Sequence, residues 1–96
     1  MKSEGVRLQN KSYSFAIRIV KLSQFLQEEK REFVLTKQIL RSGTSIGALI
    51  REAEFGQSKA DFINKMSIAL KEANETQYWL SLIHILVILK LNYLNH

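Results

Sequence analysis

The chain contains no proline and only four glycines among its 96 residues. Sheets and long loops rely on these residue types for their turns, so the composition favours long uninterrupted helices over an all-β fold. A chain of this length has room for one hydrophobic core, and its 46% hydrophobic and 24% charged residues are typical of a globular domain. We therefore predict a single all-α domain over residues 1–96.

Three segments are predicted to be helices because their apolar residues recur at helical spacing, at about 12–29, 35–54 and 58–86. The stretch 28–32 contains only charged residues and is expected to connect the first two helices. The predicted architecture is a bundle of these amphipathic helices. The residues expected to face its core are Phe15, Ile19, Leu22, Leu26, Leu35, Ile39, Ile46, Ile50, Ala53, Phe62, Met66, Ala69, Ala73, Leu80, Ile83 and Val87.

Glycines and a serine indicate where the helices end and where they pack closely. Gly56 supplies a stop for the second helix, and Ser58 with Asp61 forms a start resembling a capping box for the third. Gly43 and Gly47 lie one turn apart inside the second helix, where each weakens the helix by up to about 1 kcal/mol relative to alanine. We interpret these two glycines as a site of close helix packing.

No cofactor, metal or catalytic site is expected. The chain has no cysteine, and two distant histidines, His84 and His96, cannot assemble the usual zinc site. The segment 41–45 (Arg-Ser-Gly-Thr-Ser) superficially resembles a phosphate-binding loop, but it lacks the GxxxxGK[ST] spacing and a preceding strand. Because no nucleophile, base and acid share a defined spacing, we predict that the protein is not an enzyme and has no small-molecule substrate.

The most hydrophobic run, residues 80–89, is about half the ~20 residues needed to span a bilayer. A buried helix end is therefore favoured over a membrane anchor. Residues 1–10 have no apolar segment of the kind that secretory signals carry. The predicted location is cytoplasmic.

The positive charge of the chain is unevenly placed. Its formal net charge is +5, and residues 1–41 hold nine Lys and Arg against four Glu, whereas residues 42–96 hold five basic against five acidic residues. This asymmetry indicates either a solvated surface or a footprint for nucleic acid. Lys37, Arg41 and Arg51 project from one side of the second predicted helix and are the candidate phosphate contacts, although no aromatic-interleaved basic stripe or known reader motif is evident.

Two carboxylates, Glu72 and Glu75, are expected beside Trp79 on one flank of the third helix. We interpret them as structural, with Lys65, Arg41 or Arg51 as partners that fix the helix register. Ile17 and Val20 fall on the side of the first helix opposite its core face. They are either scattered surface residues or part of a second face buried by oligomerisation.

Several short sequence motifs occur in a characteristic order. They are Ser12-Tyr13-x-Phe15-Ala16-x-Arg18-Ile19-Val20, Leu35-Thr36-x-Gln38-Ile39-Leu40-Arg41-Ser42-Gly43-Thr44-Ser45-Ile46-Gly47-Ala48, Glu52-Ala53, Ser58, Asp61-Phe62, and Ala69-Leu70-Lys71-Glu72-Ala73-x-Glu75-Thr76-x-Tyr78-Trp79-Leu80. Over residues 12–84 the chain resembles the bacterial four-helix-bundle proteins associated with intervening sequences in 23S ribosomal RNA genes.

This resemblance implies an antiparallel up-and-down helical bundle of the four-helix-bundle type that self-associates, often as a five-fold ring. It also implies relatives that include an accessory protein of diversity-generating retroelements, which works with a reverse transcriptase and nucleic acid. The positive residues relevant to such a role would be Arg18, Lys37, Arg41 and Arg51. Arg41, Glu72 and Glu75 match positions expected to hold the helices together.

The sequence departs from the family pattern at two places. Leu49 stands where asparagine is usual, which predicts packing in place of a polar contact. The segment 92–95 resembles the turn before a fourth helix, and that helix is expected to be short or missing. Either residues 85–94 fold back as a short helix within 85–96, or another subunit fills the gap, which we favour because 85–91 lacks a turn signal.

Two functions follow with equal weight. One is a self-associating protein that contacts the backbone of RNA or DNA without reading bases. The other is a scaffold or adaptor that binds proteins and has no nucleic-acid role.

Overall fold

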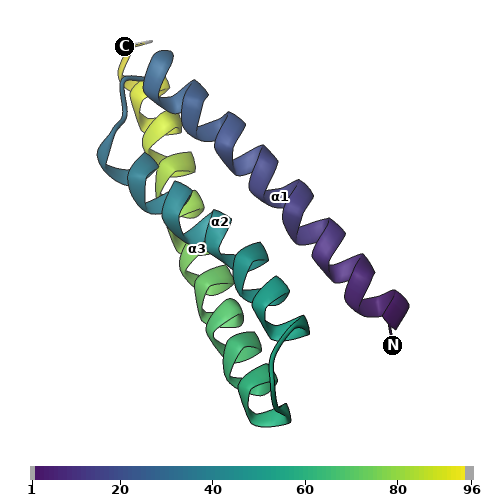
Figure 1. The fold of residues 1–96 in the computed structure, drawn as a ribbon. Coiled ribbons are helices and arrows are strands. Elements are labelled where there is room, and N and C mark those ends of the chain that lie inside the picture. The colour runs from purple at the N-terminus through teal and green to yellow at the C-terminus, as the bar shows by residue number, and fades with distance from the viewer. Residues whose placement is uncertain (1, 95–96) are drawn as a thin grey trace.

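The computed structural model describes residues 2–94, which form three α-helices. These are α1 (Lys2–Glu28), α2 (Val34–Glu54) and α3 (Lys59–Leu94), and no strand occurs in the described range. The helices alternate in direction, so α2 runs opposite to α1 and α3 (Figure 1). The predicted all-α fold is confirmed.

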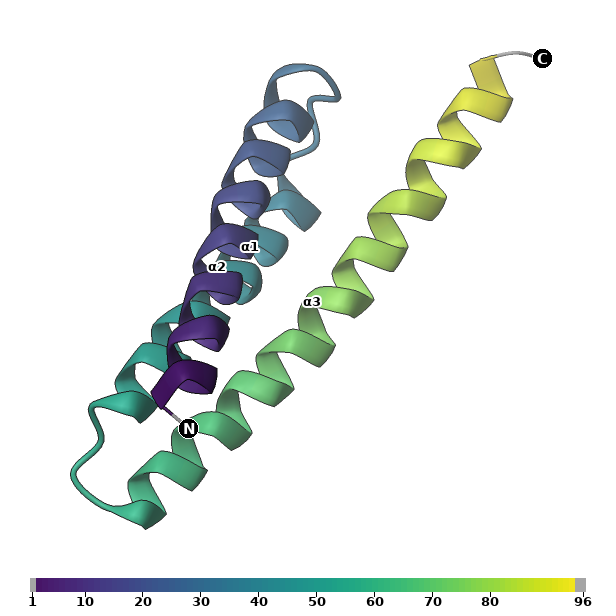
Figure 2. The same cartoon turned by 90° about the vertical axis from the view of Figure 1, so that its right-hand side faces the viewer.

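The central helix is α2, which packs against both α1 and α3. Over the part of the chain that the structure describes, no Cα atoms of α1 and α3 approach within 8 Å of each other. With 36 residues against 21, α3 is longer than α2 by about 22 Å at 1.5 Å per residue. Figure 2 shows the last turns of α3 set apart from the α1–α2 pair.

The core is a cluster to which all three helices contribute. Ile19 and Leu26 of α1, Ile39 of α2 and Ile83 of α3 are buried together. The partly buried residues packed against them are Phe15, Leu22, Leu35, Leu40, Trp79 and Leu80. The predicted core face of the first helix is therefore present in full. Phe62, which was also predicted to face the core, is instead 39% exposed near the start of α3.

The two helical glycines of α2 lie against α1. A Cβ atom built on Gly43 would lie 2.9 Å from both Cγ1 and Cγ2 of Ile19. One on Gly47 would lie 3.4 Å from the backbone of Ser12, which is ordinary contact. The interpretation of these glycines as a site of close packing is confirmed, most strongly at Gly43.

The connection between α1 and α2 is held by the side chain of Glu32. Its Oε1 accepts a hydrogen bond from the Leu35 N–H at 2.8 Å, and its Oε2 accepts bonds from the N–H and hydroxyl of Thr36, both at 2.9 Å. Desolvation raises the pKa of Glu32, but these hydrogen bonds outweigh it and hold the pKa below its ordinary value. Just before it, Arg31 adopts a left-handed backbone with φ of 55°.

The second connection follows the predicted signals. The Gly56 N–H bonds the carbonyl of Ala53 at 3.1 Å as α2 ends. The hydroxyl of Ser58 accepts a hydrogen bond from the Asp61 N–H at 3.0 Å, as an N-cap does at the start of α3. Asp61 supplies the acidic residue of the first turn.

The structure differs from the predicted helix limits at both ends of the chain. α1 begins at Lys2 instead of residue 12. Residues 2–11 lack apolar periodicity, but they are mostly good helix formers, and Glu4 lies in the first turn, where a negative charge is favourable. α3 continues to Leu94, so residues 85–94 form no separate helix and 92–94 form no turn; Asn95 lies outside the described residues. No glycine or proline follows Gly56 to end α3.

Candidate functional site

The predicted polar network joins α2 to α3. The guanidinium of Arg41 bonds Oε2 of Glu72 at 3.2 Å and Oε2 of Glu75, and it also contacts Oε1 of Gln38 at 3.4 Å. The hydrogen bond to Glu75 raises the pKa of Arg41 above its ordinary value. The charge of Arg41 is thus compensated within the chain.

A buried contact lies beneath these ion pairs. Oγ1 of Thr76, which is 1% exposed, lies 2.9 Å from Oγ of the fully buried Ser42 and 2.7 Å from the carbonyl oxygen of Glu72. Hydroxyls facing each other in this way define one register of α2 against α3. Trp79 does not join the network, because its buried Nε1 has no hydrogen-bond partner in the structure. Its indole instead packs against the core and lies edge-on to the ring of Tyr78, with 5.1 Å between the two ring centroids.

Of the other two candidate partners of the carboxylates, Lys65 bonds Oε2 of Glu52 at 3.2 Å. Arg51 is exposed on α2 and takes part in none of the ion pairs found among the described residues. Lys37 is likewise exposed on α2. Leu49 stands where asparagine is usual in the family, and packing was predicted there in place of a polar contact. Its side chain is half-buried.

Most of the net charge of the chain lies on α1. This helix holds five basic residues against two acidic ones, a net charge of +3 out of the +5 of the whole chain. Lys11 and Arg18 are exposed and belong to none of the ion pairs of the described residues. They are seven residues apart, so they share one face of the helix.

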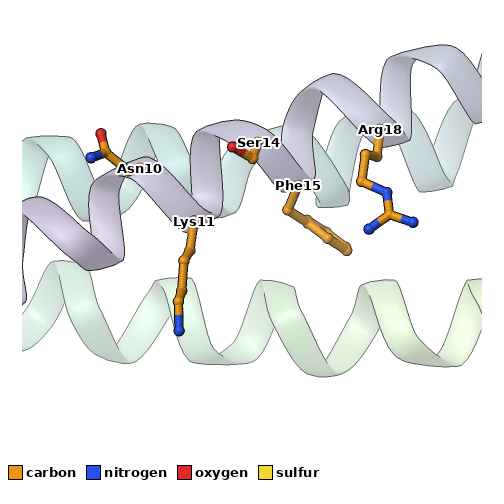
Figure 3. A pocket seen from close by; sticks show the side chains of 5 residues that line it. All are labelled: Asn10, Lys11, Ser14, Phe15 and Arg18. Atoms are coloured by element: carbon orange, nitrogen blue, oxygen red, sulfur yellow. The ribbon is translucent and has the colours of Figure 1, made fainter.

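An open, shallow groove of about 360 Å³ lies on this face of α1. We call it the α1 pocket; its lining residues are Asn10, Lys11, Ser14, Phe15 and Arg18. Figure 3 shows Lys11 and Phe15 extending from α1 on the side where α3 lies, with Arg18 one turn further along. The pocket therefore combines two cations, two neutral polar groups and one aromatic ring.

Other kinds of site are not evident in the described residues. No group of three or more His, Cys, Asp or Glu side chains among them is placed to hold a metal ion. The segment 41–45 lies in the middle of α2, where the hydroxyls of Ser42 and Thr44 bond carbonyls of the preceding turn at 2.9 and 2.6 Å. Over the same range, no helix is both long and apolar enough to cross a bilayer.

The sequence matches the model of the 23S rRNA-intervening sequence protein family over residues 4–96. The chain belongs to this family. It is also similar to a crystal structure of a protein of unknown function from the S23 ribosomal protein family of Bacteroides thetaiotaomicron, with 66% identity and a TM-score of 0.81. The similarity covers 82% of this chain and 70% of that one. No curated protein matches the chain.

Membership of the 23S rRNA-intervening sequence protein family confirms the resemblance seen in the sequence motifs. Neither the family description nor that of the solved structure names an enzymatic activity.

The structure separates the four basic residues singled out from the sequence of this 23S rRNA-intervening sequence protein. Arg18 lines the α1 pocket, Lys37 and Arg51 are exposed on α2, and Arg41 is occupied by Glu72 and Glu75.

Sequence reasoning missed Lys11 and the aromatic residue between two cations, because the first helix was expected to begin at residue 12. The spacing of Lys11, Phe15 and Arg18 at i, i+4 and i+7 could have revealed them. On this face of α1 one aromatic ring lies between two cations, a grouping that was not singled out from the sequence.

Proposed function

We propose that this protein is a nucleic-acid-associated protein that contacts backbone phosphates through the face of α1 that carries the α1 pocket. The observation that supports this most directly is the pair Lys11 and Arg18, exposed and without an ion pair in the described residues, on the helix that holds most of the net charge. Unpaired cations of this kind release counterions from a polyanion when they bind it.

The remaining candidate contacts differ in whether their charge is exposed or already paired with a carboxylate. Lys37 and Arg51 are exposed on α2 and would extend the phosphate contacts. Arg41 would contribute least, since releasing it from Glu72 and Glu75 would leave two carboxylates unpaired. The proposal thus shifts the expected contacts from α2 toward α1. A cytoplasmic location, as predicted from the sequence, would agree with this role.

Binding of a fluorescently labelled structured RNA, followed by anisotropy over a series of salt concentrations, tests the proposal. RNA is the appropriate probe because the name of the family refers to ribosomal RNA. The double variant Lys11→Glu and Arg18→Glu is compared with Lys59→Glu and Lys71→Glu, two exposed lysines of α3 that change the net charge equally.

We expect the α1 variant to bind far more weakly and to lower the slope of log K against log salt by about 2, roughly one per lost phosphate contact. The α3 variant should retain most of the affinity of the natural protein. Equal losses in the two variants would show that only net charge matters, and an RNA that fails to bind at low salt would refute the proposal.

A second candidate function is a scaffold that assembles as a homo-oligomer or on a protein partner. It is supported by the uncharged segment 80–89 of α3, where four large apolar residues are 43–56% exposed: Ile85, Leu86, Ile88 and Leu89. Exposed apolar residues gathered on one segment are typical of an interaction surface. Because α3 is longer than α2, a helix from another copy that covers these exposed residues would complete the four-helix arrangement expected from the sequence.

The mass in solution, measured by light scattering, tests this second function. A five-fold ring would give five times the 11.1 kDa mass of one chain. The variant Ile85→Lys and Leu89→Lys should dissociate the oligomer, whereas Leu70→Lys, at a position 64% exposed on the same helix, should not. A natural protein that is monomeric at high concentration would contradict self-association.

A further inference from the structure

We propose that the α1 pocket holds one unpaired nucleotide, with its base against the ring of Phe15 and its flanking phosphates on Lys11 and Arg18. The protein would then prefer single-stranded segments over duplex. This inference rests on the proposed function and specifies which form of nucleic acid the same face takes.

The spacing of the three side chains fits this arrangement. Lys11 and Arg18 are seven residues apart, so their Cα atoms are separated by about 10.5 Å along the helix axis. Phe15 lies between them on the same face, and the three residues line one groove (Figure 3). A positively charged surface interrupted by an aromatic ring is the usual way in which proteins bind single strands.

The ring of Phe15 is held in place from behind. Phe15 is half-buried and packs against the core cluster that contains Ile19 and Ile83, while its remaining surface faces the pocket. A base that stacks on it would not have to immobilise a free side chain, so little conformational entropy would be lost on binding. The exposed Phe25 of the same helix does not line the pocket. The centroid of its ring lies 5.9 Å from Nζ of Lys30.

The polar groups of the pocket are available to a ligand. The hydroxyls of Ser42, Thr76 and the exposed Ser81 each bond a carbonyl of their own helix. In the described residues, the hydroxyl of Ser14 and the amide of Asn10 make no hydrogen bond. They can therefore serve the edge of a base or a sugar hydroxyl.

The aromatic ring in the α1 pocket favours a single strand over a duplex. Paired bases present only their edges in the grooves of a duplex, so they cannot stack on a side chain without being unpaired. Contacts with a duplex would be limited to phosphates.

The test uses the natural protein and three labelled oligonucleotides of equal length: a single strand, the same strand with abasic sites, and the duplex. We expect the single strand to bind about tenfold more tightly than the abasic strand, as the loss of one stacked base implies. Phe15→Leu should remove this difference, whereas Phe15→Tyr and the control Phe25→Leu should keep it. Thermal unfolding followed by circular dichroism establishes that each variant is folded.

The outcomes separate this inference from the proposed function. If the natural protein binds the abasic strand and the intact strand equally, the base is not read by stacking, although phosphate binding through α1 stands. If an acidic polypeptide displaces the single strand as well as an unlabelled strand does, the pocket recognises charge alone and the inference is overturned. If none of the oligonucleotides binds, both proposals fail. The comparison with the abasic strand needs no variant, so it decides the matter even if Phe15→Leu does not fold.

Discussion

Replacing each helical glycine of α2 by alanine should change stability in opposite directions. Alanine is the better helix former by about 1 kcal/mol at both positions. At Gly43 the new Cβ would meet two carbons of Ile19 at 2.9 Å, well inside the normal carbon separation of about 3.5–4.0 Å. Overpacking of this kind costs about 1–3 kcal/mol, so Gly43→Ala should lower the free energy of unfolding by about 1 kcal/mol.

At Gly47 the nearest atoms, all of Ser12, would lie 3.4 Å from the new Cβ, and no rearrangement is required. Gly47→Ala should therefore raise the free energy of unfolding by up to about 1 kcal/mol. Urea denaturation followed by far-UV circular dichroism measures both values, and each kcal/mol corresponds to about 4–8 °C in Tm for a domain of this size.

A double-mutant cycle locates the cause. Ile19 is 3% exposed, and Ile19→Ala alone should cost about 2–5 kcal/mol. In that background the clash is gone, so Gly43→Ala should become stabilising. Equal effects of the two glycine substitutions in the natural background would refute the assigned approach of α1 to α2.

Three further predictions concern the connections and the α2–α3 register. Arg31→Gly should stabilise the protein by up to about 1 kcal/mol, measured by Tm, because a left-handed backbone costs a side chain about 1–2 kcal/mol, which exceeds the extra conformational entropy that glycine loses on folding. Glu32→Gln should lower the free energy of unfolding by about 1 kcal/mol at pH 7. Because folding lowers the pKa of Glu32, this difference should persist above pH 4.5 and disappear as the pH falls through the folded pKa. Thr76→Val should cost about 1 kcal/mol by urea denaturation, and a double variant with Ser42→Ala should cost less than the sum of the single changes.

The sequence was sufficient for the elements that have a strong periodic pattern. Phe15, Ile19, Leu22 and Leu26 recur on one face and all reach the core, because a helix has little choice over which face it buries. The first ten residues of α1 offered no such pattern. Their helix depends on intrinsic propensity and on contact with α2, where Gly5 lies beside Glu54.

Which cations are free could not be read from the sequence. Glu72, the first carboxylate bonded to Arg41, is 31 positions further along the chain, and Arg51 was an equally good candidate for it. Only the register of α2 against α3, defined by the contact of Ser42 with Thr76, decides between them. For this reason, and because α1 begins earlier than predicted, the principal candidate phosphate contacts lie on α1 instead of α2.

The two proposed surfaces lie on different helices, and charge couples them. Each copy carries +5, so copies that meet through the uncharged segment 80–89 of α3 still repel one another. Phosphates bound at Lys11 and Arg18 would neutralise part of that charge and favour association. By linkage, association must then raise the affinity for nucleic acid by the same factor. The nucleic-acid affinity of the Ile85→Lys and Leu89→Lys variant, corrected for its two added charges, would therefore be the affinity of the α1 face in a single copy. The factor by which the natural protein binds more tightly than this variant would measure the coupling between association and nucleic-acid binding.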